Sequence, residues 1–189
     1  MPFMQTEMPG VFIIEPRVFG DKRGYFFESY NEKLFISETG LDIRFVQDNQ
    51  SSSSKGVLRG LHFQKPPHTQ SKLVRVLSGS IFDVIVDFRK GSPAYLKWFG
   101  IELSAENKKQ IFIPKGFAHG FLVLTESAEI YYKCDDFYHP ESDSGIRWDD
   151  PDIGIKWNWE PDQFIISDKD QRLLTSRELG DIFQYGENL

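Results

Sequence analysis

Short apolar runs that are rich in β-branched and aromatic residues recur along the chain, and glycine, proline, serine and asparagine separate them. Runs of this length and composition predict β-strands rather than helices. The strands expected are residues 11–15, 25–30, 44–48, 56–63, 72–77, 81–88, 96–103, 110–113, 120–124 and 129–134. Such a density of short strands predicts an all-β sandwich or barrel.

The run 81–88 shows the expected alternation most clearly. Its even-numbered positions are apolar, whereas Asp83 and Asp87 fall on the other face. A period of two predicts that only one face of this strand packs against the core. The pair Ser78 and Gly79, just before the run, is short enough to form a hairpin.

Few segments carry a helical pattern. Residues 31–39 are expected to form a helix that has Asn31 as its N-cap and Gly40 as its stop, and a second helix is expected around residues 172–183. Residues 51–54, together with Lys55 and Gly56, are expected to form a flexible polar loop. A chain of 189 residues can bury a substantial core, so we expect one domain over residues 1–189.

Charge and cysteine content narrow the partners and the compartment. The formal net charge of -6 argues against general binding to nucleic acid or to a membrane surface, so any bound anion must be held by local cations. The single cysteine, Cys134, cannot form an intramolecular disulfide, which favours a reducing compartment. Residues 1–10 lack a signal-peptide pattern, and no run approaches the roughly 20 apolar residues of a membrane-spanning helix. We therefore expect a cytoplasmic protein.

Two histidines lie in motifs whose spacing resembles that of the cupins. His62 lies in RGLHFQ and His119 in IPKGFAHG, and the intervening segment KLVRVLSG begins with Lys72. Metal-binding cupins place His, His, Glu and His at four ligand positions, where this chain has His62, Gln64, Lys72 and His119. An ammonium group would repel a divalent cation. We therefore expect a pocket without a metal, suited to chemistry on an anionic or carbonyl-bearing substrate.

Further segments extend the resemblance to one enzyme family. They are residues 19–30, 46–49, 57–64, 103–108, 114–121 and 132–133, and the match extends from about Val11 to Asp170. In this order they resemble the dTDP-4-dehydrorhamnose 3,5-epimerase family. The resemblance implies a cupin-type double-stranded β-helix, or jelly roll, with a few short peripheral helices and no cofactor. It also implies a homodimer that acts on a dTDP-linked 4-keto-6-deoxysugar in dTDP-L-rhamnose biosynthesis.

Inverting a carbon next to a ketone requires a base, an acid on the opposite face and a positive group beside the enolate oxygen. His62 is the candidate base, and the resemblance pairs it with Asp170, which would orient the ring and stabilise its imidazolium form. The resemblance assigns the acid to Tyr132, whereas Tyr131 would point to the other face of the strand. Lys72 takes the place of the missing ligand carboxylate, next to the C4 oxygen of the sugar.

The remaining candidates would bind the nucleotide. Arg23 and Arg59 can offer bidentate donors to a diphosphate. A further group is expected to hold the pyrimidine, the deoxyribose and the sugar: Phe19, Glu28, Gln47, Asn49, His119, Tyr138 and Lys169. Asp143 stands where family members often carry a glutamate, so its shorter side chain would reach the ligand through water or not at all.

Two alternatives remain open at this stage. A related nucleotide-4-ketosugar enzyme, either a 3- or 5-epimerase of one centre or a ketoisomerase, would differ in how one face of the sugar is protonated. A non-catalytic or metal-dependent cupin would only bind a ligand or would require an ion. The combination of His62, Asp170, Tyr132 and Lys72 favours catalysis over binding alone, and a metal analysis would separate the second alternative.

Overall fold

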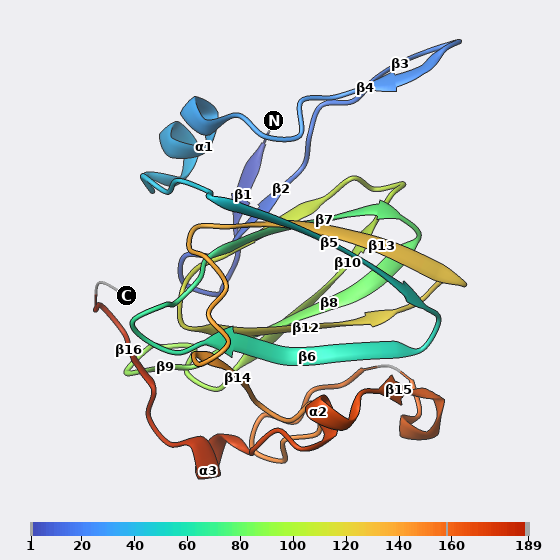
Figure 1. Ribbon diagram of the computed structural model, residues 1–189. Coiled ribbons are helices and arrows are strands. Elements are labelled where there is room, and N and C mark those ends of the chain that lie inside the picture. Colours follow the sequence, from blue (N-terminus) through green and yellow to red (C-terminus); the bar gives the residue numbers. More distant parts are fainter. Residues whose placement is uncertain (1, 158, 188–189) are drawn as a thin grey trace.

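Two β-sheets stacked face to face form the body of the molecule in the computed structural model, which describes residues 2–157 and 159–187 (Figure 1). The β7 sheet has the order β1 (Phe3–Gln5), β2 (Phe12–Ile14), β11 (Gln110–Ile113), β7 (Lys72–Ser78), β13 (Ser127–Cys134) and β5 (Gln47–Ser54). The β6 sheet has the order β10 (Trp98–Ser104), β8 (Ser80–Asp87), β12 (Phe117–Val123), β6 (Val57–Gln64) and β14 (Asp143–Gly145), and β15 (Ile165–Ile166) pairs with β6 in parallel. The all-β prediction is confirmed.

Two smaller sheets lie outside this sandwich. β3 (Phe19–Asp21) and β4 (Gly24–Phe26) form an antiparallel arm that extends away from the body, as Figure 1 shows in blue. β9 (Arg89–Lys90) and β16 (Phe183–Gln184) pair in parallel near the C-terminal end of the chain. No helix in the described part of the chain is both long and apolar enough to cross a membrane.

Helix α1 (Glu32–Thr39) is the predicted N-terminal helix, and its caps explain its bounds. The side chain of Asn31 accepts a hydrogen bond from the backbone N–H of Leu34 at 3.1 Å, and Gly40 ends the helix in the left-handed conformation. Phe35, which is buried, packs edge-on against Phe112 of β11 with ring centroids 5.1 Å apart. The helix therefore covers the outer face of the β7 sheet.

The single helix expected over residues 172–183 is wrong. Only α3 (Ser176–Leu179) is helical there, because a capping box between Thr175 and Glu178 starts it and Gly180 ends it after one turn. Two other short helical segments, η1 (Pro161–Gln163) and α2 (Asp168–Gln171), lie earlier in the C-terminal segment.

The expectation that only one face of β8 is buried is also wrong. Its apolar face packs against the C-terminal segment, including Trp157 and Phe183, beneath the β6 sheet. Its other face carries Ile81 and Ile85 into the core between the two sheets. Asp83 lies on this inner face and is only 1% exposed. Because both faces of this sheet are covered, the aspartates are buried as well. The alternation of apolar and polar residues in β8 therefore does not mark a solvent-exposed face.

Ser78 and Gly79 do not form a hairpin, because β7 and β8 belong to different sheets and pair with other strands. The two residues form a tight corner between the sheets, and Gly79 adopts a positive φ of 74° there. A Cβ at Gly79 would lie 2.1 Å from the carbonyl oxygen of Ser127, so only glycine fits this corner.

Residues 51–54 were expected to be a loop, and this is wrong. They belong to β5, whose residues pair one by one with β13. Residues 44–46 were expected to be in a strand, but they are not. β13 ends at Cys134, which pairs with Gln47, so residues before Gln47 have no strand partner there. Likewise only residues 25 and 26 of the predicted run 25–30 are in a strand, since β4 pairs with the short β3 alone.

The space between the two sheets changes from apolar to polar along its length. Over most of that length it is filled by a buried cluster that includes Val74, Ile85, Ile111 and Ile130. At the other end the inward side chains are polar. A β-sandwich core is normally continuous, so a polar end marks the place where a ligand could enter.

Candidate active site

A pocket of about 400 Å³ occupies the polar end of the sandwich. This volume lies in the range of small-ligand sites, about 300 to 1,000 Å³. Both sheets and the segments that follow β13 and β15 contribute to its wall. The lining residues are Gln47, Asn49, His62, Phe63, Gln64, Gln70, Lys72, Tyr132, Tyr138, Asp143 and Lys169.

His62 projects from β6 into this pocket and is held from behind by Asp170. The Nε2 atom of His62 lies 2.7 Å from Oδ1 of Asp170, while Oδ2 accepts a hydrogen bond from the backbone N–H of Gly60 at 3.1 Å. Asp170 is 3% exposed and lies in α2, whose N-cap Ser167 accepts from its backbone N–H. Burial by itself would raise the pKa of Asp170, but the bond and charge of His62 and the Gly60 N–H hold that pKa below its ordinary value. The carboxylate is therefore ionised and can stabilise a protonated imidazole.

Lys72 and Tyr132 face His62 from the opposite sheet. Lys72 begins β7 and Tyr132 lies on β13, and the ammonium nitrogen lies 5.9 Å from the centre of the tyrosine ring. Burial lowers the pKa of Lys72, although the negative charges of Asp83 and Asp143 and the neighbouring Cys134 partly oppose that shift. Burial raises the pKa of Tyr132. The pocket therefore holds a phenol that retains its proton across from an imidazole–carboxylate pair.

His119 was expected to contact the ligand, but it lies on the strand next to His62 and does not line the pocket. The two histidines are register partners on β12 and β6, and His119 is 7% exposed. Its Nε2 lies 2.8 Å from Oδ2 of Asp83, whose Oδ1 is buried without a partner among the described residues. A Cβ at Gly60 would lie 2.6 Å from the Cα of Gly120, so close strand packing here requires glycine.

The rim of the pocket carries the candidates for nucleotide binding. The carbonyl oxygen of the Gln47 side chain accepts from the Tyr138 N–H at 3.0 Å, and its amide donates to Asn49. Asp143 accepts from the Tyr138 hydroxyl at 3.1 Å and forms an ion pair with Lys169. The structure thus places all five of these predicted residues together.

Six predicted residues do not line this pocket: Asp170 and His119 lie next to His62 without lining it, and the other four lie elsewhere. Phe19 and Arg23 lie on the β3–β4 arm and line a separate depression there. Glu28 is exposed between the arm and α1 and accepts a hydrogen bond from Asn31. Arg59 is exposed on β6, three residues before His62, and its Nε donates to the Ser53 hydroxyl at 3.1 Å.

The four cupin ligand positions do not combine into a metal site. His62 is bonded to Asp170 and His119 to Asp83. The Gln64 side chain makes three backbone hydrogen bonds, and Lys72 contributes a positive charge rather than a lone pair. This donor set does not suit a divalent ion.

The predicted site residues did not include Asp83 or three residues that line the pocket, Phe63, Gln64 and Gln70. Asp83 holds His119, and its position on the inward face of β8 was visible in the alternation but was interpreted as the non-core face. Gln70 lines the pocket and donates to the carbonyl oxygen of Asp136. No motif in the sequence distinguishes Gln70, because its place depends on the path of the segment between β6 and β7.

The fold and the pocket define a class: a two-sheet jelly roll with a polar pocket at the open end between its sheets, lined by His62, Lys72 and Tyr132. The family model for dTDP-4-dehydrorhamnose 3,5-epimerase matches residues 5–178. The chain therefore belongs to the dTDP-4-dehydrorhamnose 3,5-epimerase family, and both the resemblance and the predicted cupin-type jelly roll are confirmed.

Individual relatives agree with this assignment. The dTDP-4-dehydrorhamnose 3,5-epimerase of Methanothermobacter thermautotrophicus is 56% identical over 93% of this chain and 95% of its own length. The enzyme of the same name from Escherichia coli K12 is 54% identical over 95% of this chain and 96% of its own length. Among solved structures, a dTDP-6-deoxy-D-glucose-3,5-epimerase from Legionella pneumophila in complex with dTDP-4-keto-L-rhamnose superposes with a TM-score of 0.94 at 46% identity, covering 98% of this chain and 99% of that chain.

Proposed function

We propose that this protein converts dTDP-4-dehydro-6-deoxy-D-glucose to dTDP-4-dehydro-L-rhamnose by inverting C3 and C5, a step of dTDP-L-rhamnose biosynthesis. The observation that carries the proposal is the placement of His62 and Asp170 on one side of the pocket and of Lys72 and Tyr132 on the facing sheet. Both carbons flank the C4 ketone, so one enolate chemistry serves both centres.

The proposed cycle moves protons only and leaves the oxidation state of the sugar unchanged. His62 takes the proton from the carbon next to the ketone, and Asp170 stabilises the resulting imidazolium. The ammonium of Lys72 holds the negative oxygen of the enolate. Tyr132 then donates its phenolic proton to the opposite face of the carbon. Exchange with solvent returns a proton to the phenol and removes one from the imidazole before the second carbon is inverted, and again before the next turnover.

The rim is proposed to hold the nucleotide. Tyr138 offers an aromatic surface to the thymine, and Gln47 and Asn49 offer directional hydrogen bonds to its edge and to the deoxyribose. Lys169 and Arg59 supply positive charge for the diphosphate. Asp143 already bonds to Tyr138 and Lys169, which supports a role in positioning these two residues.

A homodimer would bring two of the remaining predicted residues, Phe19 and Arg23, to a pocket. The β3–β4 arm extends from the body and exposes apolar rings, with Phe19 52% and Phe26 70% exposed. Exposed aromatic residues on a protruding hairpin are typical of a surface that another chain covers. We propose that the arm of one subunit carries Phe19 and Arg23 to the pocket of its partner. The proposed compartment is the cytoplasm, which agrees with a single, buried cysteine.

Product analysis tests the reaction. Incubation of the 4-keto sugar nucleotide with the purified protein should yield the L-configured ketosugar, identified by its proton couplings in NMR. A product inverted at one carbon would instead assign a single-centre epimerase, and a ketose would assign a ketoisomerase.

Mixing two inactive variants tests the arm. If the arm works between subunits, a mixture of His62→Ala and Arg23→Ala should regain activity that neither has alone, because one pocket in each mixed dimer is complete. No regain after verified subunit exchange would contradict an arm that works between subunits.

A further inference from the structure

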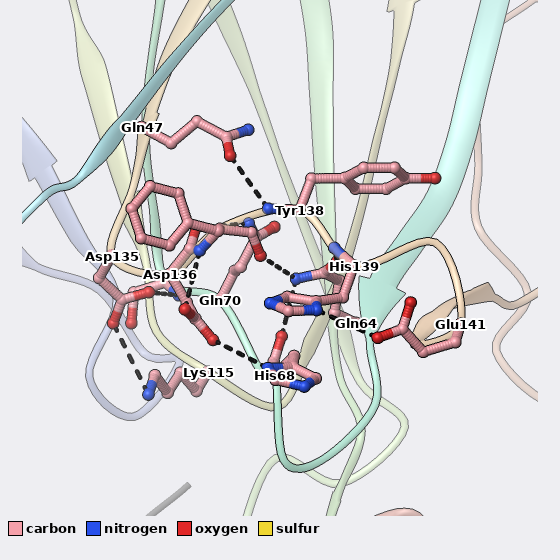
Figure 2. Close-up of polar contacts among 12 residues, drawn as sticks. Gln47, Gln64, His68, Gln70, Lys115, Asp135, Asp136, Tyr138, His139 and Glu141 are labelled. Atoms are coloured by element: carbon pink, nitrogen blue, oxygen red, sulfur yellow. Dashed lines mark hydrogen bonds and ion pairs between the residues drawn. The ribbon is translucent and has the colours of Figure 1, made fainter.

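His68 and His139 stack on one another outside the acid–base site. Their ring centroids are 3.4 Å apart and their planes differ by 9°. Asp136 lies beside them, with an oxygen 3.6 Å from Nδ1 of His68 (Figure 2). One possible ligand atom from each of these three residues lies within 4.8 Å of the other two. The chain has four histidines, so half of them meet at this point.

A single buried glutamine fixes the backbones that carry both histidines. The Gln64 side chain donates to the carbonyl oxygen of His68 at 2.7 Å and accepts from the N–H of His139 at 2.6 Å. It also donates to the carbonyl oxygen of Phe137. Gln64 is 5% exposed. The segments before β7 and after β13 are therefore held in register, and only side-chain torsions separate the three ligand atoms from closer contact.

We propose that His68, Asp136 and His139 bind one zinc ion or a similar transition-metal dication, with water in the fourth position. Imidazole nitrogens and a carboxylate oxygen are the donors such ions prefer. Bonds of about 2.0–2.1 Å in a tetrahedral site place donors about 3.3 Å apart, so the cluster must contract. Stacked rings cannot both direct a lone pair at one ion between them. Metal binding therefore turns at least one imidazole out of the stack.

Glu141 supports the proposed site from the side. Its Oε1 lies 3.1 Å from Nδ1 of His139, so Nδ1 is engaged by the carboxylate and Nε2 is the ring nitrogen left to face an ion. A carboxylate that holds the outer nitrogen of a ligand histidine is a common arrangement around zinc.

The proposed ion would lie beside the reaction site rather than in it. His62 and His119, the two histidines of the cupin positions, are bonded to other carboxylates. Tyr138, adjacent in sequence to His139, lines the pocket, so the ion would anchor the segment that presents this ring. The proposal does not depend on which reaction the pocket performs.

Titration with metal alone tests the site. Protein made without a polyhistidine tag and treated with a chelator should bind one equivalent of Co²⁺, seen by its visible absorption, and Zn²⁺ should displace it. Mg²⁺, which prefers oxygen donors, should not compete. At a Zn²⁺ concentration about 100 times the dissociation constant, the Tm should rise by about 5 °C or more.

Variants of all four histidines test whether the metal binds at His68 and His139 rather than at His62 and His119. His68→Ala, His139→Ala and Asp136→Asn should each weaken Co²⁺ binding by more than the roughly 10- to 100-fold that loss of a supporting carboxylate costs. His62→Asn and His119→Asn are the matched controls and should bind as the parent does. His139→Gln repeats the test if the alanine variant unfolds in a metal-free melt. No saturable binding by the parent, or binding that survives in a folded His68→Ala/His139→Gln variant, would overturn the proposal.

Discussion

Asp170 lies 108 residues beyond His62 in the chain, yet its Oδ1 lies 2.7 Å from Nε2 of that histidine. The pair joins helix α2 of the C-terminal segment to strand β6, and the burial of Asp170 shields the contact from water. The C-terminal segment therefore completes the site as well as covering the outer face of the β6 sheet.

Replacing Asp170 by asparagine should lower kcat by about 10²- to 10⁴-fold with little change in KM. The amide cannot stabilise the imidazolium and favours the wrong tautomer of His62. Steady-state assays on the 4-keto sugar nucleotide measure the effect. Asp168→Asn is the matched control, since Asp168 lies in the same helix with its side chain 86% exposed. Equal losses in both variants would indicate damage to α2 rather than loss of a specific contact.

Tyr132→Phe should separate removal of the proton from inversion. The variant keeps the ring and the base, so hydrogen at the exchanging carbon should still wash out into solvent while formation of the inverted product falls by about 10²- to 10⁴-fold. His62→Ala should abolish both. The two rates are compared by NMR and by product analysis. Inversion at the parent rate in Tyr132→Phe would refute its role as the acid.

The alkaline side of the pH profile should belong to Lys72. Because burial lowers its pKa below the ordinary 10.5, kcat/KM should fall as pH rises through a value below 10.5, where the ammonium becomes neutral. Burial raises the pKa of Tyr132 above 10.0, so the phenol resists losing its proton on the alkaline side. Lys72→Arg, which stays charged, should move the decline to higher pH in whatever activity remains. An unmoved decline would assign it to another group.

Removal of metal should leave turnover unchanged. The donor atoms at the four cupin positions are bonded elsewhere or cationic, so the enolate charge depends on Lys72. Extended dialysis against a strong chelator is compared with Lys72→Met, which should lower kcat by about 10²- to 10³-fold. Activity lost on chelation and restored by a divalent ion, in the parent and in the His68→Ala/His139→Gln variant alike, would return the protein to the metal-dependent cupins.

The limits of the sequence analysis follow from what each segment faces. Helix α1 and the apolar strands were predictable because their caps and their core contacts are local patterns. Strand β5 was not, because its inward residues Gln47 and Asn49 face a polar pocket and its serines carry no apolar signal. Its existence depends on pairing with β13, which is distant in the sequence.

The candidate site was likewise predictable only in part. His62 and Lys72 follow from their motifs, whereas residue spacing alone gives no reason to pair His62 with Asp170 from across the chain. Family resemblance supplied that pair. Asp83 and Gln70 take their places from tertiary contacts with His119 and Asp136, which no local pattern encodes.

Deuterium incorporation tests the central claim most directly. The 4-keto sugar nucleotide is incubated with the protein in deuterated water and followed by proton NMR. One base and one enolate-stabilising cation should serve both carbons beside the ketone, so deuterium should appear at C3 and at C5 as the L-configured product forms. Incorporation at C3 alone would limit the protein to one centre, and incorporation at neither carbon would contradict the enolate mechanism altogether.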